Sequence, residues 1–172
     1  MDFYLHQIRQ AVLSATHGMT ADQLRWRPAG KKWSASEVLE HLSLTYSGTR
    51  IVFERCLQAG KPAATSSTLK ERVRALVVVK LGHMPNGREA PAGTRPKGEP
   101  ADSILAHMSQ QIEAMDNAIR RCEERFGSST KLANHPILGP LTASEWRKFH
   151  WVHARHHVKQ IERLRKAASG AN

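Results

Sequence analysis

The sequence predicts an all-α protein, a four-helix bundle with an extra short helix and a long crossover loop. Two observations carry this prediction. Capping boxes of the form Ser/Thr-x-x-Glu/Gln begin at Thr20, Ser34, Thr68 and Thr142, and apolar residues at helical spacing follow each of them. In addition, no segment has a convincing strand pattern, so no strand is expected.

The first half of the chain should contain two long helices and a shorter one. The first is expected from about residue 2 to residue 16, with one apolar face made by Leu5, Ile8, Val12 and Ala15. A short turn follows Thr20. The second helix, about 25 residues long, starts after Ser34 and ends before Gly60 and Pro62, because glycine and proline terminate helices. A shorter basic helix is expected over residues 69–81.

The second half supplies the remaining two long helices. One begins at Pro100, a residue suited to a first helical turn, and continues to Gly127. The last runs from Thr142 to about residue 168, after a loop over residues 135–140. A flexible basic connection, about residues 61–99, would then cross between the second and third long helices. Residues 1–172 are expected to form a single domain.

The formal net charge of +11 raises the question of nucleic-acid binding. Residues 61–98 hold eight Lys or Arg against two acidic residues, and so supply +6 of that charge. No helix-turn-helix motif, zinc finger or aromatic stacking platform accompanies them, which argues against specific nucleic-acid binding. A basic nucleic-acid-associated protein is therefore kept only as a weak alternative.

Membrane and disulfide-rich classes are disfavoured. No stretch approaches the ~20 apolar residues of a membrane span, and Asp2 and Arg9 interrupt the place where a signal peptide would be apolar. Cys56 and Cys122 are too few and too far apart for a disulfide framework. We expect a cytoplasmic protein whose two thiols are buried and structural.

The last predicted helix carries four histidines within eight positions, at 150, 153, 156 and 157. Residues four apart on a helix differ by about 40° in direction and about 6 Å along the axis, so His153 and His157 can face one metal ion. His156 is rotated by about 100° from His157 and should face elsewhere. His150 could reach the same face one turn further out.

A third ligand must come from another helix, and His41 is the candidate. It lies on a stripe of the second long helix that points into the bundle, with Val38, Thr45, Gly48 and Val52. Three neutral imidazoles would leave a coordination position open, as in catalytic zinc sites. The alternative for His41 is an ordinary hydrogen-bonded core histidine, and for the last helix a chance cluster of surface histidines.

Two segments together resemble a known family. They are Trp33-Ser34-Ala35-Ser36-Glu37-Val38-Leu39-Glu40-His41-Leu42 and, over a hundred residues later, His153-x-x-His156-His157-x-x-Gln160-Ile161. Their order and spacing resemble the DinB-like superfamily of metal-binding four-helix bundles, which includes bacillithiol- and mycothiol-dependent enzymes. The likeness covers nearly the whole chain, including the turn at residues 28–30. It implies His41, His153 and His157 as metal ligands, and it implies a homodimer.

One departure from the family pattern lies beside the ligands. Many members have His-Arg-Gly-Gln where this chain has His157-Val158-Lys159-Gln160, so local packing there should differ. Gln160 and Glu37 are candidates to hold a ligand ring in place, because ligating imidazoles usually donate their other N–H to an oxygen. His150 is a further candidate for contact with a ligand. The capping box already accounts for Glu37, and Gln160 can equally be a polar residue at the end of the core.

The sequence thus favours a metal-dependent small-molecule enzyme with Zn²⁺ or Ni²⁺ at a three-histidine site. The nucleophile would be a metal-bound water, as in a hydrolase, or a low-molecular-weight thiol, as in an S-transferase. Cys56 lies fifteen residues beyond His41, about 22 Å along a helix, and so cannot be that nucleophile. The alternative is a non-catalytic metal-binding or stress-response protein whose ion stabilises the bundle.

Overall fold

The computed structural model describes residues 1–28, 30, 32–85, 87 and 89–170, and the predicted turn at 28–30 therefore includes one residue, Ala29, outside the described part. The α-helices within this part are α1 Phe3–Thr16, α2 Ala21–Arg25, α3 Ala35–Ala59, α4 Leu69–Ala75, α5 Ala101–Phe126 and α6 Ala143–Ser169. A π-helix, η1 (Leu76–Lys80), continues α4, and a 3₁₀ turn, η2 (Ala92–Thr94), lies in the following loop. The chain is thus mostly helical, as predicted.

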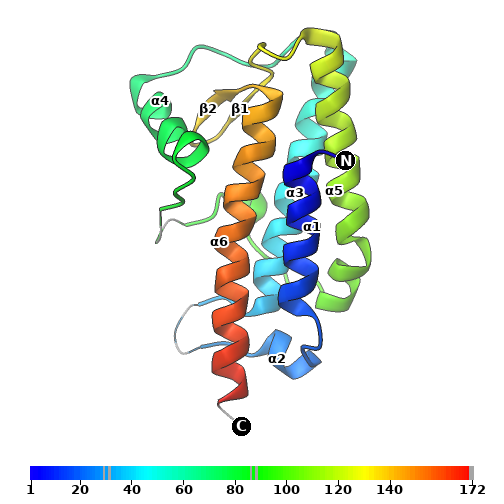
Figure 1. Ribbon diagram of the computed structural model, residues 1–172, viewed down its shortest axis with the longest axis vertical. Coiled ribbons are helices and arrows are strands. Elements are labelled where there is room, and N and C mark those ends of the chain that lie inside the picture. The colour runs from blue at the N-terminus through cyan, green and yellow to red at the C-terminus, as the bar shows by residue number, and fades with distance from the viewer. Residues whose placement is uncertain (29, 31, 86, 88, 171–172) are drawn as a thin grey trace.

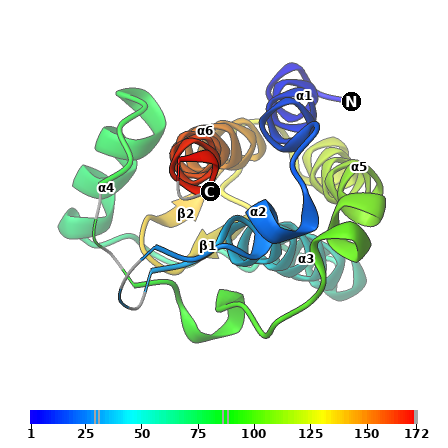
Figure 2. The ribbon, with the colours of Figure 1, turned by 90° about the horizontal axis from the view of Figure 1, so that it is seen from below.

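The four long helices α1, α3, α5 and α6 form the bundle, and α4 lies outside it (Figures 1 and 2). Figure 1 shows α3 and α5 running in one direction and α1 and α6 in the other. Because α3 and α5 are parallel neighbours, the chain must return along the whole bundle between them, which is the predicted long crossover. None of the described helices has the length and apolar character needed to cross a membrane.

All four predicted capping boxes are formed, with both reciprocal hydrogen bonds in each. These caps satisfy amides that the first turn of a helix leaves unpaired, which explains why the predicted starts agree with the observed ones. The box at Thr20 begins a short helix, α2, where the sequence suggested only a turn.

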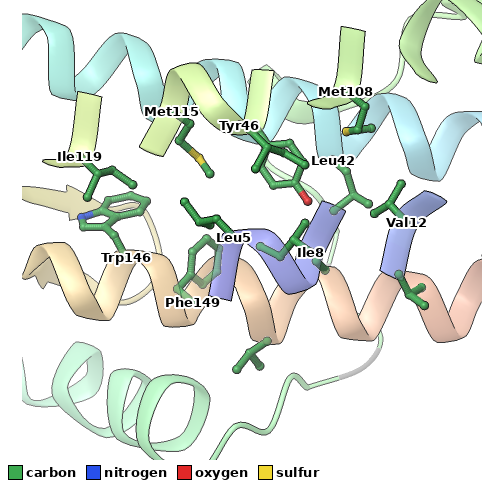
Figure 3. Close-up of a cluster of buried hydrophobic side chains, with 14 of the residues drawn as sticks. Leu5, Ile8, Val12, Leu42, Tyr46, Met108, Met115, Ile119, Trp146 and Phe149 are labelled. Atoms are coloured by element: carbon green, nitrogen blue, oxygen red, sulfur yellow. The ribbon is translucent and has the colours of Figure 1, made fainter. Parts of the chain in front are cut away.

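The core lies between the four long helices, and each of them contributes side chains to it (Figure 3). Its largest fully buried members include Leu5, Ile8, Leu42, Tyr46, Met108, Met115 and Ile119. Cys56 and Cys122 are both free and buried, in agreement with the predicted structural thiols. Close packing of this kind holds α3 and α6 in a fixed relation, and these two helices carry the candidate ligands.

The expectation of no strands was wrong, because two three-residue strands form a small hairpin between α5 and α6. Strand β1 (Ala133–His135) pairs antiparallel with β2 (Gly139–Leu141). Gly139 has a φ of +71°, and a Cβ there would lie 3.0 Å from the Glu71 side chain on α4. The strands are too short to show an alternating pattern in the sequence, and it is the turn and the contact with α4 that hold them.

The crossover connection is anchored at both ends. Near its start, Thr65 donates its amide to the Asn134 side chain at 3.0 Å. Near its end, Glu40 on α3 accepts the backbone amides of Lys97, Gly98 and Glu99 at 2.7, 2.9 and 3.1 Å. Glu40 is buried, so these three hydrogen bonds supply the partners that its carboxylate needs. They also hold η2 against α3 beside His41.

Candidate metal centre

Three histidines from two helices converge at one point inside the bundle. His153 and His157 follow each other by one turn on α6, and His41 faces them from α3. The Nε2 atom of His153 lies 3.1 Å from Nε2 of His41 and 3.1 Å from Nε2 of His157. One ring nitrogen from each histidine lies within 4.8 Å of the other two. The three side chains are therefore arranged as a cluster of possible metal ligands.

Two of these separations agree with tetrahedral coordination. Ligand nitrogens about 2.0–2.1 Å from a Zn²⁺ ion are about 3.3 Å apart when the angle between them is tetrahedral. Two observed N···N distances are 3.1 Å, which is close to this value. The residues are also only 5%, 9% and 8% exposed for His41, His153 and His157, so few water molecules compete for the nitrogens.

The outer nitrogens of two rings each have an oxygen partner, and the carbonyl partner of His41 fixes the tautomer of that ring. Nδ1–H of His41 donates to the carbonyl oxygen of Thr94 at 2.7 Å, and Nδ1–H of His157 donates to Oε1 of Gln160 at 3.1 Å. A neutral imidazole that donates through Nδ1 has a lone pair at Nε2. His41 and His157 therefore both present a lone pair to the same atom, Nε2 of His153.

Without a cation this arrangement cannot be satisfied by hydrogen bonds. Nε2 of His153 carries at most one proton, so it can direct a hydrogen bond to His41 or to His157, and the lone pair of the other ring then faces, at 3.1 Å, a nitrogen with no second proton to donate. Reversing the Gln160 amide would place the proton of His157 on Nε2, which could then donate to Nε2 of His153. The lone pairs of His153 and His41 would then face each other at 3.1 Å, so one contact would still lack a hydrogen bond. A cation between the rings accepts all three lone pairs at once, so the residues fit a bound metal.

The protonation states favour metal binding as well. Burial is the main cause that lowers the pKa of His157, to about 3, and it also lowers the pKa values of His41 and, further, of His153. The neighbouring histidines lower the pKa values of His153 and His157 further, because two adjacent imidazolium rings would repel each other. The three imidazoles are therefore neutral at neutral pH, which is the form that binds a metal ion.

The structure separates the other candidate residues from the cluster, apart from Gln160. His150 is fully buried among aromatic rings, and neither of its ring nitrogens has a hydrogen-bond partner among the described residues. Glu37 closes the cap of α3 and pairs with Arg27, so it does not contact a ligand imidazole there. His156 is half-buried beside the His157 ring and contributes no nitrogen to the cluster.

A cavity of about 730 Å³ adjoins the three imidazoles. Most of its walls are apolar, and they come from α3, α4, η1, the loop that contains η2, the hairpin and α6. Its apolar lining residues include Leu44, Val52, Val77, Ile137, Leu138 and Phe149. Phe149 also stacks on the His153 ring, with centroids 5.4 Å apart and planes at 16°. A small molecule in this cavity can reach the point at which the three nitrogens converge.

The comparison with known proteins identifies the family. The model of the DinB superfamily matches residues 4–161. The chain belongs to the DinB superfamily. It is also similar to the uncharacterized protein YuaE of Bacillus subtilis (strain 168), with 23% identity over 162 residues, which cover 87% of this chain and 87% of the relative. No solved structure is significantly similar to the chain.

Two residues beside the cluster of this DinB-superfamily protein escaped the sequence analysis. The carbonyl oxygen of Thr94 holds the His41 ring, yet a backbone carbonyl has no sequence signature. Glu40, which holds the loop carrying Thr94, adjoins His41 in the sequence. The sequence did contain a signal for Glu40, since it is an acidic residue on the buried side of a predicted helix. A buried carboxylate requires hydrogen-bond donors from elsewhere in the chain.

Proposed function

We propose that this DinB-superfamily protein binds one divalent cation, Zn²⁺ or Ni²⁺, through Nε2 of His41, His153 and His157. The observation that carries the proposal is the pair of 3.1 Å contacts in which His41 and His157 both turn a lone pair toward His153. Thr94 and Gln160 orient the two outer rings through their Nδ1–H groups, as oxygen partners do for ligating histidines.

We further propose that the site makes the protein a metal-dependent small-molecule enzyme, of the thiol S-transferase or hydrolase type. A divalent cation with an open position supplies Lewis acidity that lowers the pKa of a water or thiol nucleophile. The nucleophile must come from outside the chain, since Cys56 and Cys122 are both buried away from the cluster. The adjoining cavity would hold the substrate and limit access of bulk water to it.

The experiment for metal binding is elemental analysis of protein purified without a nickel column. Wild type should carry about one equivalent of Zn²⁺ or Ni²⁺, and His153→Ala should lose it. His156→Ala is the matched control, because this histidine lies on the same helix outside the cluster and should leave the metal content unchanged. Equal metal content in wild type and His153→Ala would contradict the proposed site.

Catalysis is tested separately, by screening metal-loaded protein with low-molecular-weight thiols plus electrophiles and with esters. Turnover that His41→Ala abolishes supports the enzyme. If chelation lowers the melting temperature and no condition gives turnover, the ion has a structural role and the protein is a non-catalytic metal-binding protein. From the family resemblance we also propose a homodimer, which light scattering after gel filtration would test. The cytoplasmic location expected from the sequence is a separate proposal.

A further inference from the structure

The cavity beside the histidines has a chemical character of its own. Its volume of about 730 Å³ lies within the range of about 300–1,000 Å³ typical of small-molecule sites. The lining residues Arg74 and Glu89 carry charges, and both are exposed at the surface. Apart from the histidine cluster and these two residues, the walls are made mainly of aliphatic and aromatic side chains.

Several elements supply these walls. Val73 of α4 and Val77 and Val78 of η1 face the cavity from outside the bundle. Opposite walls come from α3, from the turn of the hairpin and from α6, with Leu44, Val52, Ile137, Leu138, Trp146 and Phe149. Apolar walls favour an apolar occupant, because they exclude water without offering hydrogen bonds to replace it.

A glycine, Gly48, occupies a helical position in the wall of this cavity. It lies in the middle of α3, two turns after His41, and lines the cavity. Its φ is not positive, so the backbone does not require glycine, and glycine is among the least favourable residues inside a helix. A Cβ at this position would meet no atom of the described residues within 4 Å, so close packing among them does not require glycine either. The lack of a side chain at Gly48 leaves space in the cavity.

We propose that this cavity binds the aliphatic or aryl body of a substrate whose polar reacting group lies at the three histidines, and that Gly48 leaves room for that body. The position of the reacting group rests on the function proposed above. The apolar part does not, because the walls exist whether or not a metal binds. The substrate class is thus a small amphiphilic molecule with a hydrophobic body, rather than a highly charged metabolite.

The test uses n-alkyl hydroxamates of increasing length, from acetohydroxamate to octanohydroxamate, titrated into zinc-loaded protein by calorimetry. Each buried methylene should raise the affinity roughly three- to fourfold until the cavity is filled. Gly48→Phe should bind zinc and acetohydroxamate as wild type does but bind octanohydroxamate at least tenfold more weakly. Gly48→Ala is the matched control and should stay within about threefold of wild type, since one methyl group takes little space.

A metal-free arm separates this inference from the proposed metal site. Butan-1-ol and octan-1-ol are titrated into chelator-treated protein, and binding is followed by the fluorescence of Trp33 and Trp146, which line the cavity. Octanol should bind more tightly than butanol, and Gly48→Phe should remove the difference. If zinc fails to bind but the chain-length effect remains, the metal proposal fails alone. Affinity independent of chain length, or unchanged in Gly48→Phe, overturns the inference.

Discussion

Replacement of His153 by leucine should have opposite effects with and without metal. His153 is the central member of the cluster, with Nε2 3.1 Å from Nε2 of both His41 and His157. Its Nδ1 is buried and has no hydrogen-bond partner among the described residues. A buried polar group without a partner costs about 1–3 kcal/mol, so the metal-free wild type is strained at this point. His153→Leu removes that cost and keeps an apolar contact with Phe149. Water in the adjoining cavity can reach the lone pairs left on His41 and His157, which line it, so the variant should be at least as stable as metal-free wild type.

Zinc should reverse the order of stability. A ligand at one hundred times its dissociation constant stabilises the folded state by about 2.7 kcal/mol. For a chain of this size, about 1 kcal/mol corresponds to about 2–4 °C, so the melting temperature of wild type should rise by about 5–11 °C. His153→Leu has lost the central ligand and should show little rise.

Thermal unfolding followed by circular dichroism, with excess zinc and with a chelator, measures both effects. The control His156→Ala should keep the zinc-dependent rise, because His156 offers no nitrogen to the cluster. The reasoning would be refuted if His153→Leu lost several kcal/mol of stability in chelator, or if zinc left the melting temperature of wild type unchanged.

Three further predictions concern residues around the cluster. Gln160→Leu removes the acceptor of the His157 Nδ1–H and should lower zinc affinity about 10- to 100-fold in a chelator competition. The control Glu37→Ala removes the cap of α3, so it should cost about 1 kcal/mol of stability and leave zinc affinity unchanged. Glu40→Ala removes the acceptor of three loop amides and should increase proteolysis within residues 83–99 and weaken zinc binding; a loop still resistant in this variant would argue against that anchor. Burial lowers the pKa of His150 to about 3, so below pH about 6.5 the unfolded chain takes up a proton that the folded one does not. This residue should therefore make the free energy of unfolding fall by about 1.4 kcal/mol for each pH unit below that point. In urea unfolding with chelator, His150→Phe should show a dependence of stability on pH that is smaller by that amount. An unchanged dependence would mean that His150 titrates normally.

The helices could be predicted closely because their signals are local. Caps at Ser34 and Thr142 and terminators such as Gly60 act within one turn of the helix end, and the structure confirms these boundaries. The hairpin at residues 133–141 was missed since its three-residue strands depend on a turn and on contact with α4. Local patterns cannot report such a contact, because its partner is more than sixty residues away in the sequence.

Several expectations remain predictions. These are the extent of the single domain over residues 1–172, the mobility of the basic connection at residues 61–99, the homodimer, the cytoplasmic location and the thiol partner. Family membership supports the ligand assignment, while the identity of the metal depends on availability as much as on affinity.

For this protein, the sequence alone determined which residue types lie on which helix face. Helical periodicity is a local property, and it places His153 and His157 one turn apart and His41 on the inner side of α3. Only the tertiary structure decided that Nε2 atoms from α3 and α6 meet, that the Thr94 carbonyl reaches His41, and that Gly48 opens on an apolar cavity. Those contacts arise from the packing of distant segments, and the free energy that selects one packing is distributed over the whole core.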